Sequence, residues 1–251
     1  MADLDQPRLP SRAQIPRVRG PRVLSGTALA TLKSNGSIPT KGSWGGARNR
    51  RDRTSWHLSK TQCEGLIAAA RYAEHIGLAF NRHWTVHYER AGIADIDAPE
   101  FIGRLLKLAR DYSTRKKNGH FTALWVRENG EGKGGHVHIL MHMPAERTLR
   151  GRTRRWVTLA GGKYKPRTSR VVSIGGRLIS ADSGSEHYQH NVGAVLAYVL
   201  KGADHQTGEA LSLPRSGEGG LVIGKRCGWS QNIGKGSRIE QETLRIGKTA
   251  G

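Results

Sequence analysis

A histidine-rich run stands near the middle of the chain: Gly135-His136-Val137-His138-Ile139-Leu140-Met141-His142-Met143. Side chains of a β-strand alternate between its two faces, so His136 and His138 would project from the same face. The opposite face would carry only apolar residues, which suits packing against helices. Two neutral imidazoles on one strand face can bind a single transition-metal ion.

A metal site of this kind also needs an oxygen ligand. Glu128 ends the strand that is predicted before the histidines, and the turn at Asn129-Gly130 brings the chain back beside it. We therefore predict that Glu128, His136 and His138 hold a divalent metal ion, Mn²⁺ or Mg²⁺. The alternative is a pair of exposed or core histidines, because a His-x-His pattern alone is weak evidence for a site.

Downstream, Tyr198 and Lys201 are three residues apart in a segment with helical apolar spacing. Positions i and i+3 of a helix share a face, so the phenol and the ammonium group would project together. A phenol is a poor nucleophile at its usual pKa, and a nearby cation or metal ion would activate it. Taken alone, however, this pair is also what a packed tyrosine and a solvated lysine at a helix end would give.

Residues 147–170 are strongly basic and contain no acidic residue. Trp156 and Tyr164 are interleaved with the charges, and positive charge combined with aromatic faces is typical of a surface that binds single-stranded nucleic acid. An ordinary exposed helix and loop is the alternative. The predicted DNA-binding residues are Arg147, Arg150, Arg152, Arg154, Arg155, Lys163, Lys165 and Arg167, with Arg170 continuing the series.

The composition favours a nucleic-acid partner. The 251 residues include 41 Lys and Arg against 20 Asp and Glu, for a formal net charge of +21. Such a chain attracts polyanions. No apolar run approaches the roughly 20 residues of a membrane span and no signal-peptide core follows Met1, so we expect no membrane partner. Two distant cysteines, Cys63 and Cys227, form no disulfide framework or zinc motif, which favours a reducing bacterial cytoplasm.

The periodicity predicts an α+β fold with a central antiparallel β-sheet and helices on one side of it. Strands are expected at residues 84–88, 121–126 and 136–143, and a hairpin at 171–179. Helices are expected at 66–76, from Asp97 with a capping box to Glu100, and at 191–200. We predict a disordered basic arm over residues 1–55, a domain over 56–210, and a Gly-rich basic segment over 211–251.

The ordered pair of motifs resembles the HUH endonucleases, which are named for a His-hydrophobe-His strand. His136-Val137-His138 matches their metal motif, and Tyr198-x-x-Lys201 matches their catalytic helix motif in the same order. The resemblance covers about residues 80–205, with residues 84–88 where a first motif strand would lie. The segment 224–230 is also similar to that group, without an assigned role.

The resemblance implies an RNA-recognition-motif-like sheet and a rolling-circle replication initiator of plasmid or filamentous-phage type. Tyr198 would attack single-stranded DNA at an origin hairpin, form a 5′-phosphotyrosine link and leave a 3′-hydroxyl primer, with Lys201 assisting. The DNA would lie in a groove lined by residues 147–170, and host replication proteins are expected partners. A single Tyr-x-x-Lys motif is similar to the single-tyrosine enzymes, since Tyr188 is ten residues away.

Three other functions remain open from the sequence. A relaxase or transposase of the same superfamily would use the same chemistry on another DNA target. A non-catalytic nucleic-acid-binding protein would use the histidines only for structure. A metal-dependent hydrolase of small phosphoesters would not need the basic stretch. The DNA target sequence, the physiological metal and the oligomeric state do not follow from the residues.

Overall fold

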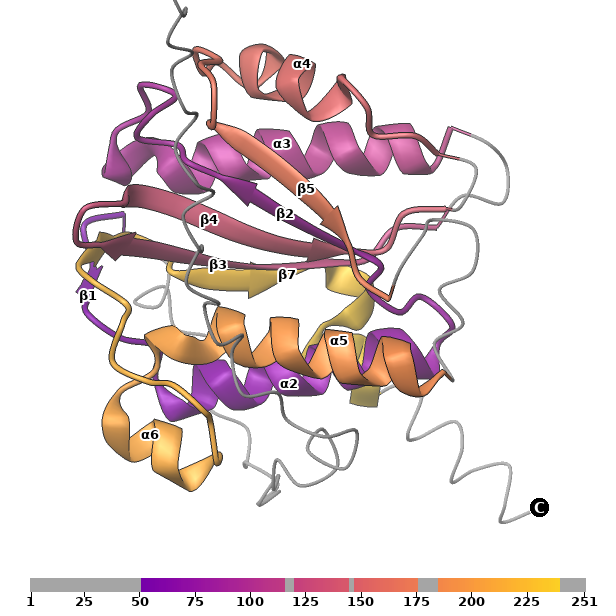
Figure 1. Ribbon diagram of the computed structural model, residues 1–251, viewed down its shortest axis with the longest axis vertical. Coiled ribbons are helices and arrows are strands. Elements are labelled where there is room, and N and C mark those ends of the chain that lie inside the picture. The colour runs from indigo at the N-terminus through magenta and orange to yellow at the C-terminus, as the bar shows by residue number, and fades with distance from the viewer. Residues whose placement is uncertain (1–50, 116–119, 145–146, 176–184, 240–251) are drawn as a thin grey trace, which may run out of the picture.

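The structure is a computed structural model that describes residues 51–115, 120–144, 147–175 and 185–239 (Figure 1). Nearly all of the predicted basic arm and the chain beyond residue 239 lie outside these ranges. The described residues form an α+β fold around a five-stranded sheet, as predicted. The strands are β2 (Arg82–Val86), β3 (Ala123–Gly130), β4 (Gly134–Met141), β5 (Ser169–Ser173) and β7 (Cys227–Trp229).

The sheet has the order β5-β2-β4-β3-β7, and every neighbouring pair is antiparallel. β3 and β4 form the central hairpin, in which Gly132 and Gly134 adopt φ of 70° and 66°. This left-handed conformation costs glycine little, which allows the tight return. The hairpin pairs Glu128 with His136 and Val126 with His138. The second half of the hairpin predicted at 171–179 falls outside the described residues.

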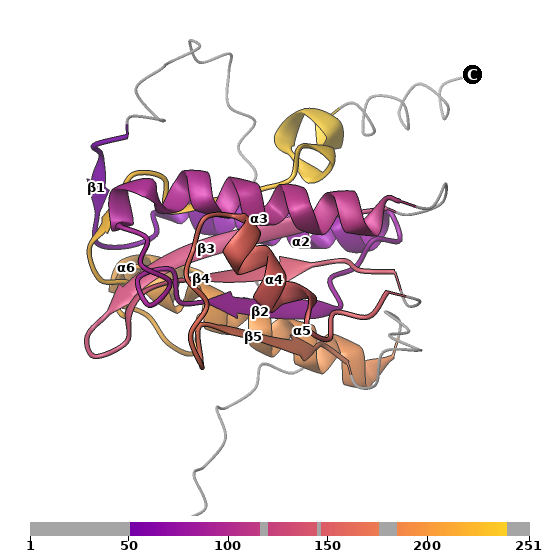
Figure 2. The same cartoon turned by 90° about the horizontal axis from the view of Figure 1, so that it is seen from above.

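Helices cover both faces of the sheet, which corrects the expectation of helices on one side (Figure 1). α3 (Ala98–Ser113) and α4 (Arg152–Leu159) pack on one face, and Figure 2 shows the two side by side. α2 (Lys60–His75) and α5 (Glu186–Val199) pack on the other. The reason is that the strands are apolar on both faces: Ile139 joins the α3 core, while Leu140 joins the α2 and α5 core.

The helix starts differ in detail from the sequence prediction. α3 begins after Asp97 with Pro99 in its first turn, but the Asp97 side chain makes no capping hydrogen bond. Asp97 instead forms an ion pair with Arg51, and Glu100 pairs with Arg104 along the helix. A complete capping box occurs at α2, between Ser59 and Gln62. α5 begins at Glu186, about one turn before the predicted start.

The sheet continues beyond the expected boundary at residue 210. After α6 (His205–Ala210), β6 (Val222–Ile223) pairs with β1 (Thr54–Ser55), and β7 pairs with β3. The buried Arg226 guanidinium donates hydrogen bonds to the backbone oxygens of Ser55, Gly219 and Gly220. The segment 224–230 therefore has a structural role, because it fastens the chain before α2 and the loop before β6 to the sheet.

Candidate metal centre

The register of the central hairpin brings the three predicted metal ligands together. Glu128 Oε2 lies 3.3 Å from His136 Nε2 and 3.6 Å from His138 Nε2. The candidate ligand atoms of the three residues all lie within 4.8 Å of one another, and all three side chains are buried. The described residues thus include a cluster that could hold a metal ion.

Hydrogen bonds orient both imidazoles toward this cluster. His136 Nδ1 lies 2.9 Å from the Gly134 carbonyl oxygen, to which it donates, so Nε2 is the ring nitrogen that faces Glu128. His138 Nδ1 lies 3.1 Å from Thr85 Oγ1 and 3.1 Å from His83 Nε2. Partners of this kind fix the tautomer of a metal-binding histidine.

Unpaired buried atoms also show that the cluster suits a divalent cation. Glu128 Oε1 and His138 Nε2 are buried and have no hydrogen-bond partner among the described residues. Buried polar atoms normally find partners, so two unpaired acceptor atoms in a single cluster suit the binding of a cation. A carboxylate oxygen and imidazole nitrogens are donors that Mn²⁺ and related ions accept.

The charges of the centre favour the forms of the residues that bind metal. Burial alone would raise the pKa of Glu128, but the adjacent imidazoles of His136 and His138 and the charge of Lys201 lower it well below its usual range. Burial lowers the pKa of His138, which favours the neutral imidazole. The centre therefore holds an ionised carboxylate beside the neutral imidazole of His138.

Tyr198, in the last turn of α5, and Lys201, in the 3₁₀ turn Leu200–Gly202 that follows it, both lie beside this cluster. The Tyr198 ring lies edge-on to the His138 ring, with 5.1 Å between centroids, and the Lys201 Nζ lies 4.4 Å from the centre of the Tyr198 ring. Lys201 is buried and forms an ion pair with Glu128. Burial and the charge of Glu128 raise the pKa of Tyr198. The i, i+3 pair predicted from the sequence therefore stands at the metal cluster.

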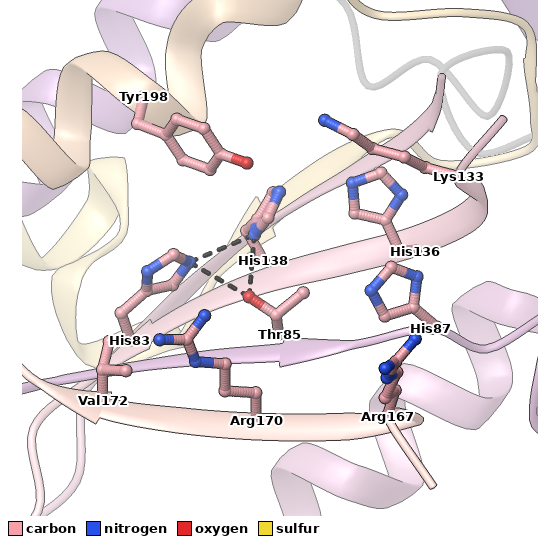
Figure 3. Close-up of a pocket in the computed structure, with 10 residues that line it drawn as sticks. All are labelled: His83, Thr85, His87, Lys133, His136, His138, Arg167, Arg170, Val172 and Tyr198. Atoms are coloured by element: carbon pink, nitrogen blue, oxygen red, sulfur yellow. Dashed lines mark hydrogen bonds between the residues drawn. The ribbon is translucent and has the colours of Figure 1, made fainter. Parts of the chain in front are cut away.

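The sequence analysis missed three side chains of β2 and its end. His83, Thr85 and His87 face a cleft of about 720 Å³ together with Tyr198, His136 and His138 (Figure 3). The signal was present, because polar residues at 83, 85 and 87 alternate with buried Trp84, Val86 and Tyr88. That alternation identifies a polar face of β2. Only the pairing of β2 with β4 shows that this face lies on the same side of the sheet as His136 and His138.

The predicted DNA-binding residues fall into two separate places, which corrects the single groove expected over residues 147–170. α4 packs through Trp156 and Val157 on the α3 face, whereas the metal cluster lies on the opposite face of the sheet. Arg147 and Arg152 contact the ring of Tyr112 there.

The remaining basic residues divide in the same way. Arg154 contacts the ring of Tyr164, and Arg150 and Arg155 are exposed beside or on α4. Lys163 and Lys165 are exposed in the loop between α4 and β5. Only Arg167 and Arg170 line the cleft at the metal cluster. The two groups separate because α4 and β5 belong to different layers.

His142 follows the same alternation along the chain but does not join the cluster. Its Nδ1 lies 3.0 Å from the carbonyl oxygen of Ala79, beyond the end of β4. Cys63 and Cys227 are buried free thiols. In the ranges that the structure describes, no helix is both long and apolar enough to cross a bilayer.

No protein-family model, curated protein or solved structure matches this chain.

Proposed function

We propose that the protein is a metal-dependent endonuclease that nicks and rejoins single-stranded DNA through Tyr198, with Mn²⁺ or Mg²⁺ bound by Glu128, His136 and His138. The observation that carries this proposal is the position of the Tyr198 ring, 5.1 Å from the ring of His138. A nucleophile is useful only where the reacting phosphate is held, and the metal ligands mark that place.

The metal ion, when bound, supplies a Lewis acid that polarises a phosphate oxygen and stabilises developing negative charge. The chain supplies the other parts. The Tyr198 oxygen forms a bond to phosphorus, the bond from phosphorus to the 3′ oxygen breaks, and the phenol proton is balanced by the proton that the leaving 3′ oxygen takes up. The ammonium group of Lys201 lies 4.4 Å from the centre of the Tyr198 ring and would attract negative charge that develops on the phenol oxygen.

The products are a 5′-phosphotyrosine link and a free 3′-hydroxyl. One phosphodiester replaces another, so little bond energy is lost and the same site can run the step backwards to rejoin the strand. The free 3′-hydroxyl can prime synthesis, which favours replication initiation of the HUH type at an origin hairpin, with host replication proteins as partners. Mobilisation and transposition use the same step, and the native DNA target distinguishes them.

The test is to trap the covalent product. The full chain is incubated with mixed-sequence single-stranded DNA that is labelled at the 5′ end in one sample and at the 3′ end in another, with Mn²⁺, Mg²⁺ or EDTA. On a denaturing gel we expect the 3′ label to move with the protein and the 5′ label to leave on a shortened strand. EDTA should abolish both changes.

Two other results would contradict the proposal. Shortened strands with a new 5′-phosphate and no protein adduct would mean that water is the nucleophile. DNA that is bound but never cut with either metal would mean that the protein is a non-catalytic binding protein.

A further inference from the structure

A row of paired residues crosses the floor of the cleft from the metal centre to the β5 edge. His138 of β4 pairs with Thr85 of β2, and Thr85 pairs with Arg170 of β5. Residues paired across neighbouring strands project from the same face, so Arg170 lies on the side of the metal ligands. Two strand spacings, about 10 Å in all, separate the backbones of His138 and Arg170.

The charge of the cleft is positive throughout its outer part. Lys133, Arg167 and Arg170 line it, and the described residues that line it include no carboxylate. Figure 3 shows the two arginines rising from the β5 side toward the histidines, with Tyr198 on the opposite side. A guanidinium pair of this kind matches the geometry of a phosphate.

The backbone of Arg167 is held in a conformation that arginine does not favour. Its φ is 66°, in the left-handed region that suits glycine. The buried Thr168 fixes this turn, because its Oγ1 accepts from the Lys165 N–H at 3.1 Å and its carbonyl accepts from the His87 N–H at 2.8 Å. Strained backbone of this kind clusters at ligand sites, so Arg167 is a candidate ligand-binding residue in the cleft that it lines.

We propose that Arg167 and Arg170 form a seat for a second phosphate of the DNA strand, next to the one at the metal centre. The strand then crosses the sheet from Tyr198 toward β5 and stays away from α4. This inference rests on the proposed function, which supplies the ligand of the seat: the phosphate backbone of single-stranded DNA. It separates the seat from the larger basic group on the α3 face, which has no part in positioning the strand.

The strain at Arg167 permits a sharp experiment. Arg167→Gly removes the charge and relieves the backbone, so the variant should melt no lower than its parent. The test variant combines Arg167→Gly with Arg170→Gln in a Tyr198→Phe background. The control variant, Arg150→Gln/Arg155→Gln in the same background, removes the same amount of charge on the opposite face of the sheet. Binding of a single-stranded oligonucleotide is followed by fluorescence anisotropy in EDTA over a range of salt concentrations.

Each lost phosphate contact lowers the log–log salt slope for a single strand by about 0.7, so the Arg167/Arg170 variant should lose about 1.4. The Arg150/Arg155 variant should keep the parent slope. Equal losses in both variants, or no loss in the first, would overturn the seat.

The same arginine substitutions are also made in the protein that keeps Tyr198, and adduct formation by these variants is measured. This assay separates the inference from the proposed function. If no adduct ever forms but the salt slopes differ as expected, the phosphate seat is supported and the nuclease proposal is refuted. If the adduct forms equally well with and without the two arginines and the salt slopes are unchanged, the phosphate seat is refuted and the nuclease proposal is supported.

Discussion

The phenol ring of Tyr198 stands at 75° to the imidazole of His138, with 5.1 Å between the ring centroids. These two residues come from α5 and β4, which lie in different layers of the fold. A phosphate that contacts an ion held by His138 would therefore also lie beside the phenol.

Tyr198→Phe should abolish the covalent DNA adduct while DNA and metal binding persist. The change removes one oxygen from a side chain that is 37% exposed, so the free energy of unfolding should fall by less than about 1.5 kcal/mol. Mass spectrometry of the nuclease-trimmed wild-type adduct should place the nucleotide on Tyr198.

Tyr188→Phe and Tyr164→Phe are the matched controls for this prediction. Tyr188 donates a buried hydrogen bond to the carbonyl of Phe80, so its loss should cost about 1 kcal/mol of stability and leave the adduct intact. An adduct found on either of these tyrosines would refute the assignment of Tyr198.

His136→Ala and His138→Ala should each weaken Mn²⁺ binding, as measured by isothermal titration calorimetry. The loss should exceed the roughly 10- to 100-fold that follows when only a supporting hydrogen bond is removed. His142→Ala is the control, because its imidazole contacts the Ala79 carbonyl and not the cluster. Equal Mn²⁺ affinity in all four proteins would show that these histidines do not bind the ion.

Lys201→Met should destabilise the metal-free protein by about 3–5 kcal/mol, because it leaves the buried Glu128 carboxylate without its cation. Mn²⁺ should restore most of this loss in thermal denaturation, since a bound ion supplies the missing positive charge. Lys225→Met, at an exposed lysine, should change little with or without the metal. A Lys201 variant as stable as wild type in EDTA would show that the ion pair does not form.

Stability should fall as the pH rises above about 8.5, the usual pKa of a thiol in an unfolded chain. Burial raises the pKa of Cys63 to about 12 and that of Cys227 to about 11. Between about 8.5 and these values the unfolded chain binds fewer protons than the folded one, so each thiol lowers stability by up to about 1.4 kcal/mol per pH unit.

Urea denaturation at pH 7.5 and pH 10 measures this slope. Cys63→Ala/Cys227→Ala should be less stable at pH 7.5 but should lose less stability between the two pH values. The same slope in both proteins would mean that other groups are responsible for the alkaline sensitivity.

The sequence was sufficient to predict the cluster of Glu128, His136 and His138 because its members are positioned by local rules. Alternation along one strand places His136 and His138 on one face, and a short turn places Glu128 opposite His136. The i, i+3 relation of Tyr198 and Lys201 is equally local. Each of these inferences needs only the neighbouring residues, so tertiary packing did not alter them.

The parts that the sequence did not predict depend on which layer each element joins. The basic charges around α4 looked continuous with Arg167 and Arg170, but α4 packs on the α3 face and β5 belongs to the sheet. His83 and His87 were not recognised because nothing local shows that β2 lies next to β4. β7 has three residues, too few for a detectable period, and only its pairing with β3 shows that it belongs to the sheet.

The ion pair between Glu128 and Lys201 has a consequence for a chain that is still on the ribosome. The two residues are 73 positions apart, which takes about 4 to 15 seconds to translate at roughly 5 to 20 residues per second. During that interval the β3–β4 hairpin cannot bury Glu128 against its own lysine. A nascent chain that stops before residue 201 therefore lacks the cation that makes this burial favourable, and truncated products should be left open to proteolysis rather than persist with a partly built metal centre.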